Sequence, residues 1–290
     1  MPEVVLTGAA GRIEGRYSPG KKDNAPIALI LHPHPRAGGT MNHPVSAQLF
    51  LMFMQRGFSV LRFNFRGVGR SQGEFDAGIG ELADAATALD WLQGVNPTAT
   101  QTWVAGFDFG AYIGMQLLMR RPETDGFISV SPPTNMYDFS FLAPCPASGL
   151  FLHGSADGVV PPSEVERVVT KLRTQKGIVI DYDIVDGADH FWAHNLADVD
   201  KHVGGYLDKR LEAEPALTVS DLARPLTIKL PTVLKHLDVR QCGTTGCCRE
   251  IGVMRLLTAA IRSRHALVQP EAESAGQAQH GRGGADEHDP

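Results

Sequence analysis

The 290-residue sequence has only four cysteines and no long hydrophobic run. Cys242, Cys247 and Cys248 crowd into one segment near the C-terminus, whereas Cys145 stands alone. This distribution excludes a disulfide scaffold and fits a reducing compartment. No apolar stretch approaches the ~18 residues of a membrane-spanning helix, and the N-terminus lacks the basic and apolar regions of a signal peptide. We therefore expect a cytoplasmic protein.

The sequence also lacks a strong excess of charge of either sign. Its formal net charge is −5, with 20% charged and 43% hydrophobic residues. This composition is ordinary for a globular protein and allows a sizeable buried core. The absence of a basic footprint across the whole chain argues against nucleic acid as a partner.

From Pro26 to about Glu212, short apolar segments alternate with segments of helical periodicity. We predict strands at 27–31, 58–63, 103–105, 127–130, 150–152 and 178–180, and helices at 44–55, 81–92, 111–121, 163–175 and 196–211. Apolar strands alternating with amphipathic helices predict a mostly parallel sheet with helices on both faces. Ligands of such sheets bind at the carboxyl ends of the strands.

A turn of the pattern small–x–nucleophile–x–small follows the strand at 103–105. Gly106 and Gly110 flank Asp108, and an apolar helix follows. Such a turn holds its central residue in a strained conformation and presents the side chain at the head of the helix. Glycines permit the close approach that the turn requires. Asp108 is therefore the candidate nucleophile.

Two further candidates follow in the chain order nucleophile, acid, histidine. Asp157 comes after the strand at 150–152, and His190 comes after the last predicted strand. A carboxylate at Asp157 would hold the His190 ring in one tautomer and stabilise its imidazolium form. His190 would then act as a general base on water or on a nucleophile.

The loop at residues 32–39, HPHPRAGG, follows the first long apolar strand. Together with the backbone N–H of Phe109, it offers hydrogen-bond donors to a developing oxyanion. His34 and Arg36 of this loop are our candidates for oxyanion or substrate binding. For His32 and His34 the alternative stays open that each bonds only to backbone carbonyl groups.

These motifs resemble those of the capless α/β-hydrolases related to dienelactone hydrolase. The resemblance rests on HPHPRAGGTMN at His32–Asn42, FNFRGVGRSQG at Phe63–Gly73, the elbow, the acid loop GSADGVVPP and the HF at His190. It covers roughly residues 1–211. It implies an α/β-hydrolase fold without a cap domain over residues 1–213. The family has Ser where this sequence has Asp108.

Asp108 leaves three readings open. In the first, it displaces a leaving group from an sp³ carbon, as in haloalkane dehalogenases and epoxide hydrolases of this fold, and His190 activates the hydrolytic water. Against this reading, the short segment Ser131–Pro146 leaves no room for a helical cap, and Phe109 replaces the Trp that dehalogenases often use. In the second, the protein is a carboxylic-ester or lactone hydrolase by descent with a substituted nucleophile. In the third, it binds its ligand without turnover.

Several other residues carry weaker signals. Arg62, Arg66 and Arg70 are expected to form internal ion pairs rather than a phosphate site. Trp192, beside His190, is expected to pack in the interior. Cys145 is expected to be a small buried residue.

Residues 214–239 resemble part of the helix-turn-helix of ArsR-type winged-helix repressors, and residues 240–290 are predicted to be a disordered tail. A DNA-binding regulator is thus an alternative of a different class, but nothing after Val239 resembles a third helix or a wing. The cysteine cluster lacks the paired C-x-x-C arms of a zinc site. We predict a dispensable extension.

The combined expectation is one catalytic domain that acts on a small-molecule substrate with neither metal nor organic cofactor. We expect no membrane or nucleic-acid partner, and a homo-oligomer stays open.

Overall fold

The computed structural model describes residues 2–213 of the chain. The strands are β1 Glu3–Gly8, β2 Gly11–Ser18, β3 Ile27–Leu31, β4 Ser59–Phe63, β5 Thr102–Phe107, β6 Gly126–Val130, β7 Ser148–Gly154 and β8 Ile180–Val185. The helices are α1 Pro44–Gln55, α2 Ile79–Val95, α3 Phe109–Arg120, α4 Pro162–Arg173 and α5 Leu196–Ala213, with short 3₁₀ turns η1 Pro35–Ala37 and η2 Ser140–Leu142. The predicted helix-turn-helix fragment (214–239), the predicted disordered tail (240–290) and the cysteine cluster lie outside the described residues.

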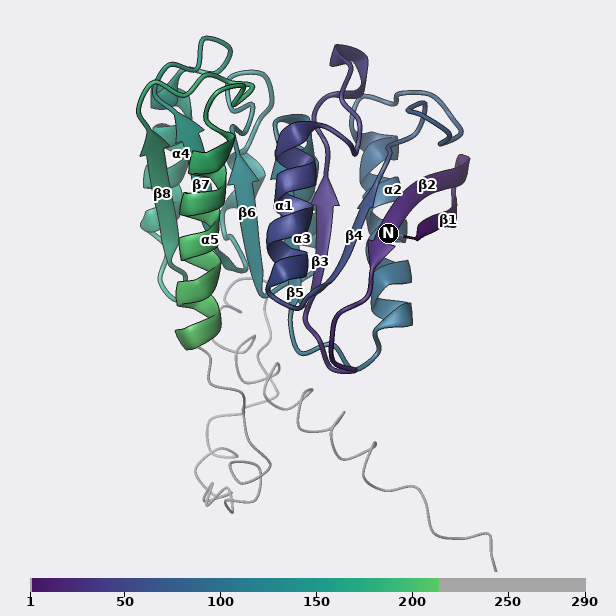
Figure 1. Cartoon of the computed structure of the whole chain (residues 1–290). Helices are drawn as coiled ribbons and strands as arrows, with labels where there is room; N and C mark the ends of the chain where they lie inside the picture. The colour runs from purple at the N-terminus through teal and green to yellow at the C-terminus, as the bar shows by residue number, and fades with distance from the viewer. Residues whose placement is uncertain (1, 214–290) are drawn as a thin grey trace, which may run out of the picture. The chain divides into compact units, whose positions relative to one another are not determined.

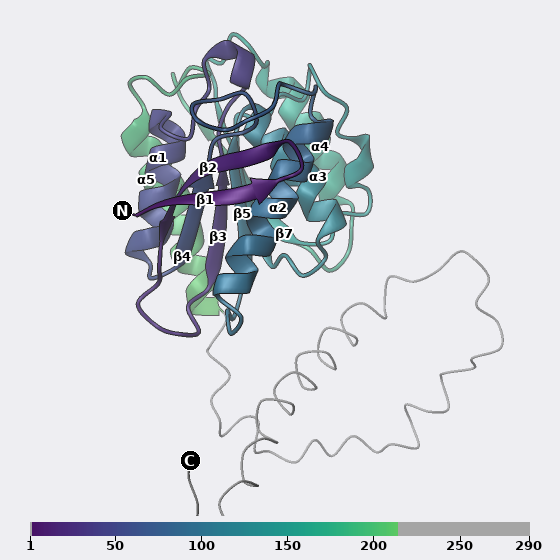
Figure 2. The ribbon, with the colours of Figure 1, turned by 90° about the vertical axis from the view of Figure 1, so that its right-hand side faces the viewer.

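The strands form one eight-stranded sheet in the order β1-β2-β4-β3-β5-β6-β7-β8. From β4 to β8 every neighbouring pair is parallel. The β1–β2 hairpin is antiparallel, pairs antiparallel with β4 and forms one edge of the sheet (Figure 2). The predicted mostly parallel sheet with helices on both faces is therefore confirmed.

Two helical layers cover the sheet (Figure 1). On one face α1 and α5 pack together, and buried side chains such as Phe53 and Val203 meet Trp103 of β5. On the other face α2 and α3 pack together beside α4, with Leu89 and Ile113 among the buried residues. Each fully buried aliphatic or aromatic side chain stabilises the fold by about 1.5–3 kcal/mol.

The carboxyl ends of the central strands meet at one edge of the sheet. In the register of the parallel pairs, Leu31 of β3 lies opposite Gly106 of β5, and Phe107 lies opposite Val130 of β6. The loops after β3, β5, β7 and β8 therefore project from the same edge, at the top of Figure 1. This alignment brings together residues that are far apart in the sequence.

Two features of the sheet differ from the sequence-based prediction. The hairpin β1–β2 was not predicted, because its strands are partly exposed and present no continuous apolar run. The strand predicted at 178–180 is wrong: β8 spans Ile180–Val185. As an edge strand with partly exposed positions, β8 alternates polar and apolar residues, and the apolar run just before it misled the prediction.

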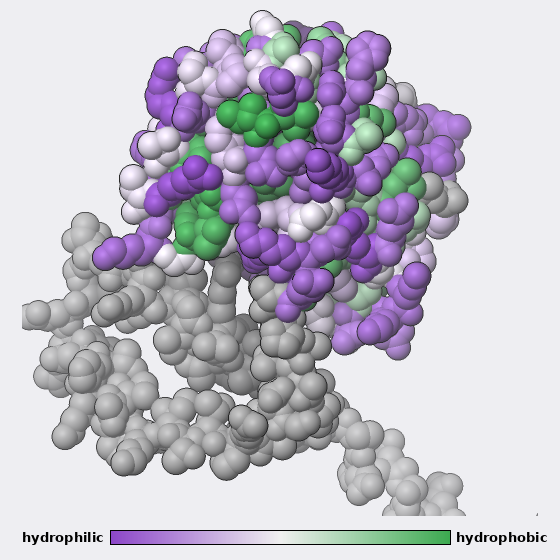
Figure 3. Space-filling model, turned by 60° about the vertical axis from the view of Figure 1, so that its left-hand side comes forward, coloured by the Kyte–Doolittle hydropathy of each residue, from purple (hydrophilic) through white to green (hydrophobic). Residues whose placement is uncertain are grey.

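Within residues 2–213, no cap domain covers the edge that carries the loops. The segment between β6 and β7 contains only the short turn η2. On the face seen in Figure 3, apolar side chains form separate small patches within a mostly hydrophilic surface. Among the helices of residues 2–213, none has the length and apolarity needed to cross a bilayer.

The arginines of β4 and of the loop that follows it bind partners within the fold. Arg66 pairs with Asp84 of α2, its Nη2 2.8 Å from Oδ1 and its Nε 2.9 Å from Oδ2. Arg62 donates from Nη1 to the Met41 carbonyl, and Arg70 pairs with the exposed carboxylate of Glu3. The internal ion pair is thus confirmed for Arg66. Cys145, separately, is buried, and burial raises the pKa of its thiol.

Candidate active site

Asp108 lies in a sharp turn between β5 and α3. Its φ of 52° and ψ of −123° fall in a region that residues with a side chain rarely adopt. The strain is possible because Gly106 and Gly110 lack side chains: a Cβ on Gly106 would overlap the Gly110 carbonyl, and a Cβ on Gly110 would overlap the Leu31 carbonyl. The predicted strand–turn–helix elbow is therefore present.

The Asp108 carboxylate is bound by two backbone amides and also faces a histidine. Oδ2 accepts the His34 backbone N–H at 3.0 Å, and the Phe109 amide also hydrogen-bonds to the carboxylate. Oδ1 lies 3.6 Å from Nε2 of His190. Burial raises the pKa of Asp108, but the hydrogen bonds from His190 and the two amides outweigh it and lower the pKa below its ordinary value. Asp108 is thus ionised at neutral pH.

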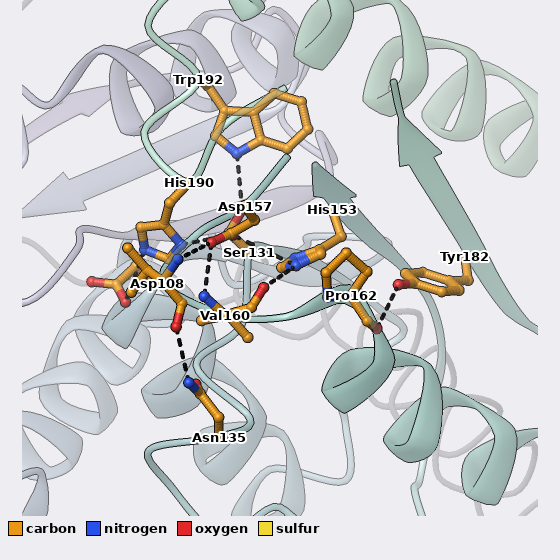
Figure 4. A network of polar contacts seen from close by, with 11 residues as sticks. Asp108, Ser131, Asn135, His153, Asp157, Val160, Pro162, Tyr182, His190 and Trp192 are labelled. Carbon is orange, nitrogen blue, oxygen red and sulfur yellow. Dashed lines mark hydrogen bonds and ion pairs between the residues drawn. The ribbon is translucent and has the colours of Figure 1, made fainter. Parts of the chain in front are cut away.

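Asp157 binds the opposite nitrogen of the same imidazole ring. Its Oδ2 lies 2.8 Å from Nδ1 of His190. Its Oδ1 accepts the backbone N–H groups of Val159 at 2.9 Å and Val160 at 2.8 Å (Figure 4). Burial raises the pKa of Asp157, but the hydrogen bonds from His190 and these amides lower it overall. The acid loop therefore holds a fixed carboxylate.

His190 lies between two carboxylates. Burial lowers its pKa, but hydrogen bonds and ion pairs with Asp108 and Asp157 outweigh burial and raise the pKa to about 9. At neutral pH the ring is an imidazolium. In this resting form His190 cannot accept a proton, so it becomes a base only when the charge beside it changes.

A hydrogen bond between Trp192 and Ser131 anchors the loop that carries His190. Both residues have positive φ, 59° and 42°, and the indole Nε1–H donates to the Ser131 hydroxyl at 3.0 Å (Figure 4). Trp192 is 1% exposed and belongs to the core. The prediction that Trp192 packs in the interior is confirmed, whereas the contribution of Ser131 was missed because no motif marks it.

His153 is a second residue that sequence reasoning missed. It is fully buried at the end of β7, with Nε2 2.9 Å from the Val160 carbonyl and 3.5 Å from Oδ2 of Asp157. Since a carbonyl can only accept, Nε2 carries the proton and braces the acid loop. The signal in the sequence was the histidine at the end of a buried strand, four residues before Asp157 of the acid loop.

The two loop histidines after β3 have different surroundings. His32 is buried, its Nδ1 lies 2.7 Å from the Pro33 carbonyl and its Nε2 accepts the Phe65 N–H at 3.0 Å. Burial lowers its pKa to about 3, so it is a neutral structural residue. His34 is only partly buried and lies beside Asp108. For His32 the backbone-bonding alternative therefore applies.

Arg36 lies at the exposed tip of the same loop. Its guanidinium carbon is 4.7 Å from the centre of the Phe75 ring, and it makes no hydrogen bond to the three candidate catalytic residues. Within residues 2–213 no group of three or more His, Cys, Asp or Glu side chains is arranged to hold a metal ion. The described groups that can act on a substrate here are thus carboxylates, imidazoles and backbone amides.

Comparisons with known proteins agree with this architecture. A family model described as X-Pro dipeptidyl-peptidase (S15 family) matches residues 16–159. An uncharacterised protein of Rickettsia prowazekii is 50% identical over 211 residues, which cover 71% of this chain and 89% of that protein.

Two solved structures have the same fold. A protein of unknown function from Agrobacterium tumefaciens, assigned to the α/β hydrolases, is 58% identical, with a TM-score of 0.72 over 73% of this chain and 98% of that one. An α/β serine hydrolase without a lid from Xanthomonas campestris is 30% identical, with a TM-score of 0.66 over 74% and 96% of the two chains. The chain therefore belongs to the α/β-hydrolase superfamily, and its relatives are capless hydrolases of the serine-hydrolase type.

Proposed function

We propose that this hydrolase cleaves a bond at an sp³ carbon through a covalent alkyl ester of Asp108. The observation that carries the proposal is the state of the Asp108 side chain. It is an ionised carboxylate whose Oδ2 accepts the His34 backbone N–H of the loop after β3, and the Phe109 amide of the elbow also hydrogen-bonds to the carboxylate. Oδ1 has only the longer contact of 3.6 Å to His190. That oxygen is the one free to attack.

In the first step, Oδ1 attacks the substrate carbon and forms a C–O bond. The bond from that carbon to the leaving group breaks, and its electron pair departs with the leaving group. The negative charge of Asp108 is consumed. Because that charge helps to hold the pKa of His190 at about 9, its loss lowers the pKa, and the ring releases its Nε2 proton to solvent.

In the second step, neutral His190 takes a proton from water, and the hydroxide attacks Cγ of Asp108. The negative charge that develops on Oδ2 meets the His34 amide, which already binds this oxygen, and the Phe109 amide donates to the same carboxylate. The tetrahedral intermediate collapses and expels the alkoxide, which takes the proton from His190. The proton of the new Asp108 carboxyl then passes to His190 and restores the ion pair.

Direct attack of Asp108 on an ester carbonyl is disfavoured by the same geometry. It would produce a mixed anhydride, which is a high-energy intermediate. The Asp108 carboxylate already occupies the backbone amides of His34 and Phe109 that an ester oxyanion would need. The imidazolium form of His190 cannot act as a base on water.

A second candidate function is carboxylic-ester hydrolysis with Asp108 in the place of a serine. It is favoured by one observation, the 30% identity to an α/β serine hydrolase without a lid. In this alternative the chain retains the scaffold of an ester hydrolase, and replacement of Asp108 by serine restores the activity.

Multiple-turnover hydrolysis in ¹⁸O water tests the proposal. The full chain and the variants Asp108→Ser and Asp108→Ala are incubated with haloalkanes, haloalkanoates, epoxides and short esters. We expect ¹⁸O in the Asp108 carboxylate of the unchanged chain after turnover, with no label in the Ala variant. Esterase activity in the Ser variant alone, with no labelling of Asp108 by any substrate, would favour the second candidate.

A further inference from the structure

The imidazole of His34 is held beside the attacking carboxylate. Its backbone N–H lies 3.0 Å from Oδ2 of Asp108. Its ring centre is 4.9 Å from the Phe109 ring and 4.9 Å from the Phe75 ring. The ring contacts two aromatic side chains, and its own backbone N–H is hydrogen-bonded to Asp108. These contacts leave the ring little freedom to move away from the elbow.

The hydrogen bonds of His34 define its tautomer. The backbone N–H of Arg36 donates to Nδ1 at 3.1 Å, so Nδ1 is an acceptor and carries no proton. Burial lowers the pKa of His34, the charge of Asp108 raises it, and the charge of Arg36 lowers it; the net direction is down. The ring is therefore neutral at pH 7, with its single proton on Nε2.

The Nε2–H of His34 is a donor without a partner in the protein. Among residues 2–213, no acceptor lies within hydrogen-bond distance of it. His34 is only partly buried, and it lies in the loop after β3 at the open edge of the sheet. A fixed, unused N–H beside a nucleophilic carboxylate can bind an atom that gains negative charge during the attack.

We propose that the Nε2–H of His34 binds the departing anion, and that this anion is a halide, so that the substrates are halogenated aliphatic compounds. The inference rests on the proposed alkylation of Asp108. Oδ1 forms the C–O bond while the carbon–halogen bond breaks, and the halide leaves with the electron pair. The halide accepts a hydrogen bond from Nε2, and no proton is transferred.

The neutrality of His34 is the reason for preferring a halide to an epoxide oxygen. A neutral imidazole donates a hydrogen bond, but release of its only N–H proton would leave an unfavourable imidazolate. A halide is stable as an anion and needs no proton, whereas the alkoxide from an epoxide must be protonated. Arg36 lies in the same loop as His34, with its guanidinium group over the Phe75 ring. Its positive charge adds attraction for an anion.

Tyr137 is the alternative hydrogen-bond donor for the leaving group. Its ring centre is 5.8 Å from that of Phe109, and burial together with the charge of Asp108 raises the pKa of its phenol. A phenol can give up its proton, so Tyr137 would suit an epoxide oxygen. The variants His34→Phe and Tyr137→Phe each remove one donor and keep an aromatic ring, while His34→Gln retains an N–H donor and the backbone amide of residue 34.

The experiment measures single-turnover alkylation of Asp108 in the full chain by intact-protein mass, using 1-chlorobutane, 1-bromobutane, 1-iodobutane and 1,2-epoxybutane. The additional variant His190→Gln traps the alkyl ester. We expect His34→Phe to slow alkylation by roughly 10²-fold, more for the chloride than for the iodide, because chloride is the poorer leaving group. His34→Gln should recover part of the loss, and Tyr137→Phe should change the rate by less than about threefold.

Four results would overturn the inference. Alkylation by the epoxide alone would leave the alkyl-enzyme route in place and exclude the halide. Unchanged halide rates in folded His34→Phe, or a larger loss in Tyr137→Phe, would exclude His34 as the donor. Absence of any adduct on Asp108 with all four reagents would reject the alkyl-enzyme route itself.

Discussion

Asp108 and Asp157 flank one imidazole ring, and the two carboxylates are held in different ways. Asp157 is 5% exposed, lies 2.8 Å from Nδ1 of His190 and accepts two backbone amides in a relaxed loop. Asp108 is 9% exposed, lies 3.6 Å from Nε2 and is attached to a backbone with φ of 52°. Both residues are ionised aspartates, but Asp157 is held to the His190 ring by a short contact and Asp108 by a longer one.

In the proposed function this difference corresponds to different tasks for the two carboxylates. A short contact supported on both oxygens fixes the ring and leaves no oxygen free for a substrate. In the proposed function, Oδ1 with its longer contact is the nucleophile, and the ester that forms lies against the His34 amide already bound to Oδ2. Strain at the elbow keeps this second side chain at the open edge of the sheet. In the proposed function Asp157 orients and Asp108 reacts.

The largest expected effect comes from removing the reacting carboxylate. Asp108→Ala should lower kcat on an alkylating substrate by roughly 10⁶-fold, because no covalent intermediate can form. Product release measured by gas chromatography checks the loss, with circular dichroism as the folding control. Residual activity within tenfold of the unchanged chain would show that Asp108 is not the nucleophile.

His190→Gln should separate the two steps. Attack by Asp108 needs no base, whereas hydrolysis of the ester does, so we expect about one equivalent of product anion and then a loss of about 10⁴-fold in turnover. Intact-protein mass should show the added alkyl group. Full turnover without an adduct would contradict the role of His190 as the hydrolytic base.

Asp157→Asn should have a smaller effect than Asp108→Ala or His190→Gln. The amide cannot stabilise the imidazolium and permits the wrong tautomer, so kcat should fall by about 10³-fold. Alkylation of Asp108 should continue, because the attacking oxygen is untouched. If alkylation stopped as well, the division of labour between the two carboxylates would be wrong.

The pKa of His190 provides a further comparison of its two partners. With a pKa of about 9 in the folded chain, against 6.5 for an ordinary histidine, the ion pairs contribute stability that is fully present below pH ~6.5 and is lost as the pH rises through 9. Asp108→Ala and Asp157→Ala should each lower the pKa, and each should flatten the stability curve between these values.

NMR titration of the His190 ring and urea unfolding at pH 6 and pH 9 measure these two quantities. His202→Ala is the matched control, because His202 pairs with Asp183 away from the elbow. A His190 pKa that stays near 9 in Asp108→Ala would remove the proposed trigger by which alkylation converts the ring into a base.

The smallest expected effect concerns the hydrogen bond between Trp192 and Ser131, which anchors the His190 loop. Trp192→Phe keeps the buried ring but removes the 3.0 Å hydrogen bond to Ser131, leaving a buried hydroxyl without its donor. We expect a loss of about 1–2 kcal/mol in the free energy of unfolding, measured by urea denaturation. Ser131→Ala and the double variant should complete the cycle; fully additive losses would show that the two side chains do not interact.

Much of the fold was predictable because buried parallel strands have a strong pattern. The apolar run at 27–31 and the helix at 44–55 coincide with β3 and α1. The edges of the sheet were not predictable in the same way. β1, β2 and β8 are partly exposed, so their residues alternate or mix, and pairing with a neighbouring strand rather than apolar content makes them strands.

The candidate site divides in the same manner. Asp108, Asp157 and His190 are each marked by turn residues at fixed offsets after a strand, so their chain order and spacing identify them. Ser131 and His153 act through one contact each, to Trp192 and to the acid loop. Such contacts depend on which loops become neighbours, and no local pattern records that.

The sequence by itself determined the scaffold and the elbow, because glycine spacing and hydrophobic periodicity are local constraints on the backbone. It also placed an aspartate where relatives of the serine-hydrolase type lead one to expect a serine. The tertiary structure decided what that aspartate is: an ionised side chain that accepts two backbone amides and faces an imidazolium. Charge state and hydrogen-bond partners depend on residues from four different loops, which only folding brings to one edge of the sheet.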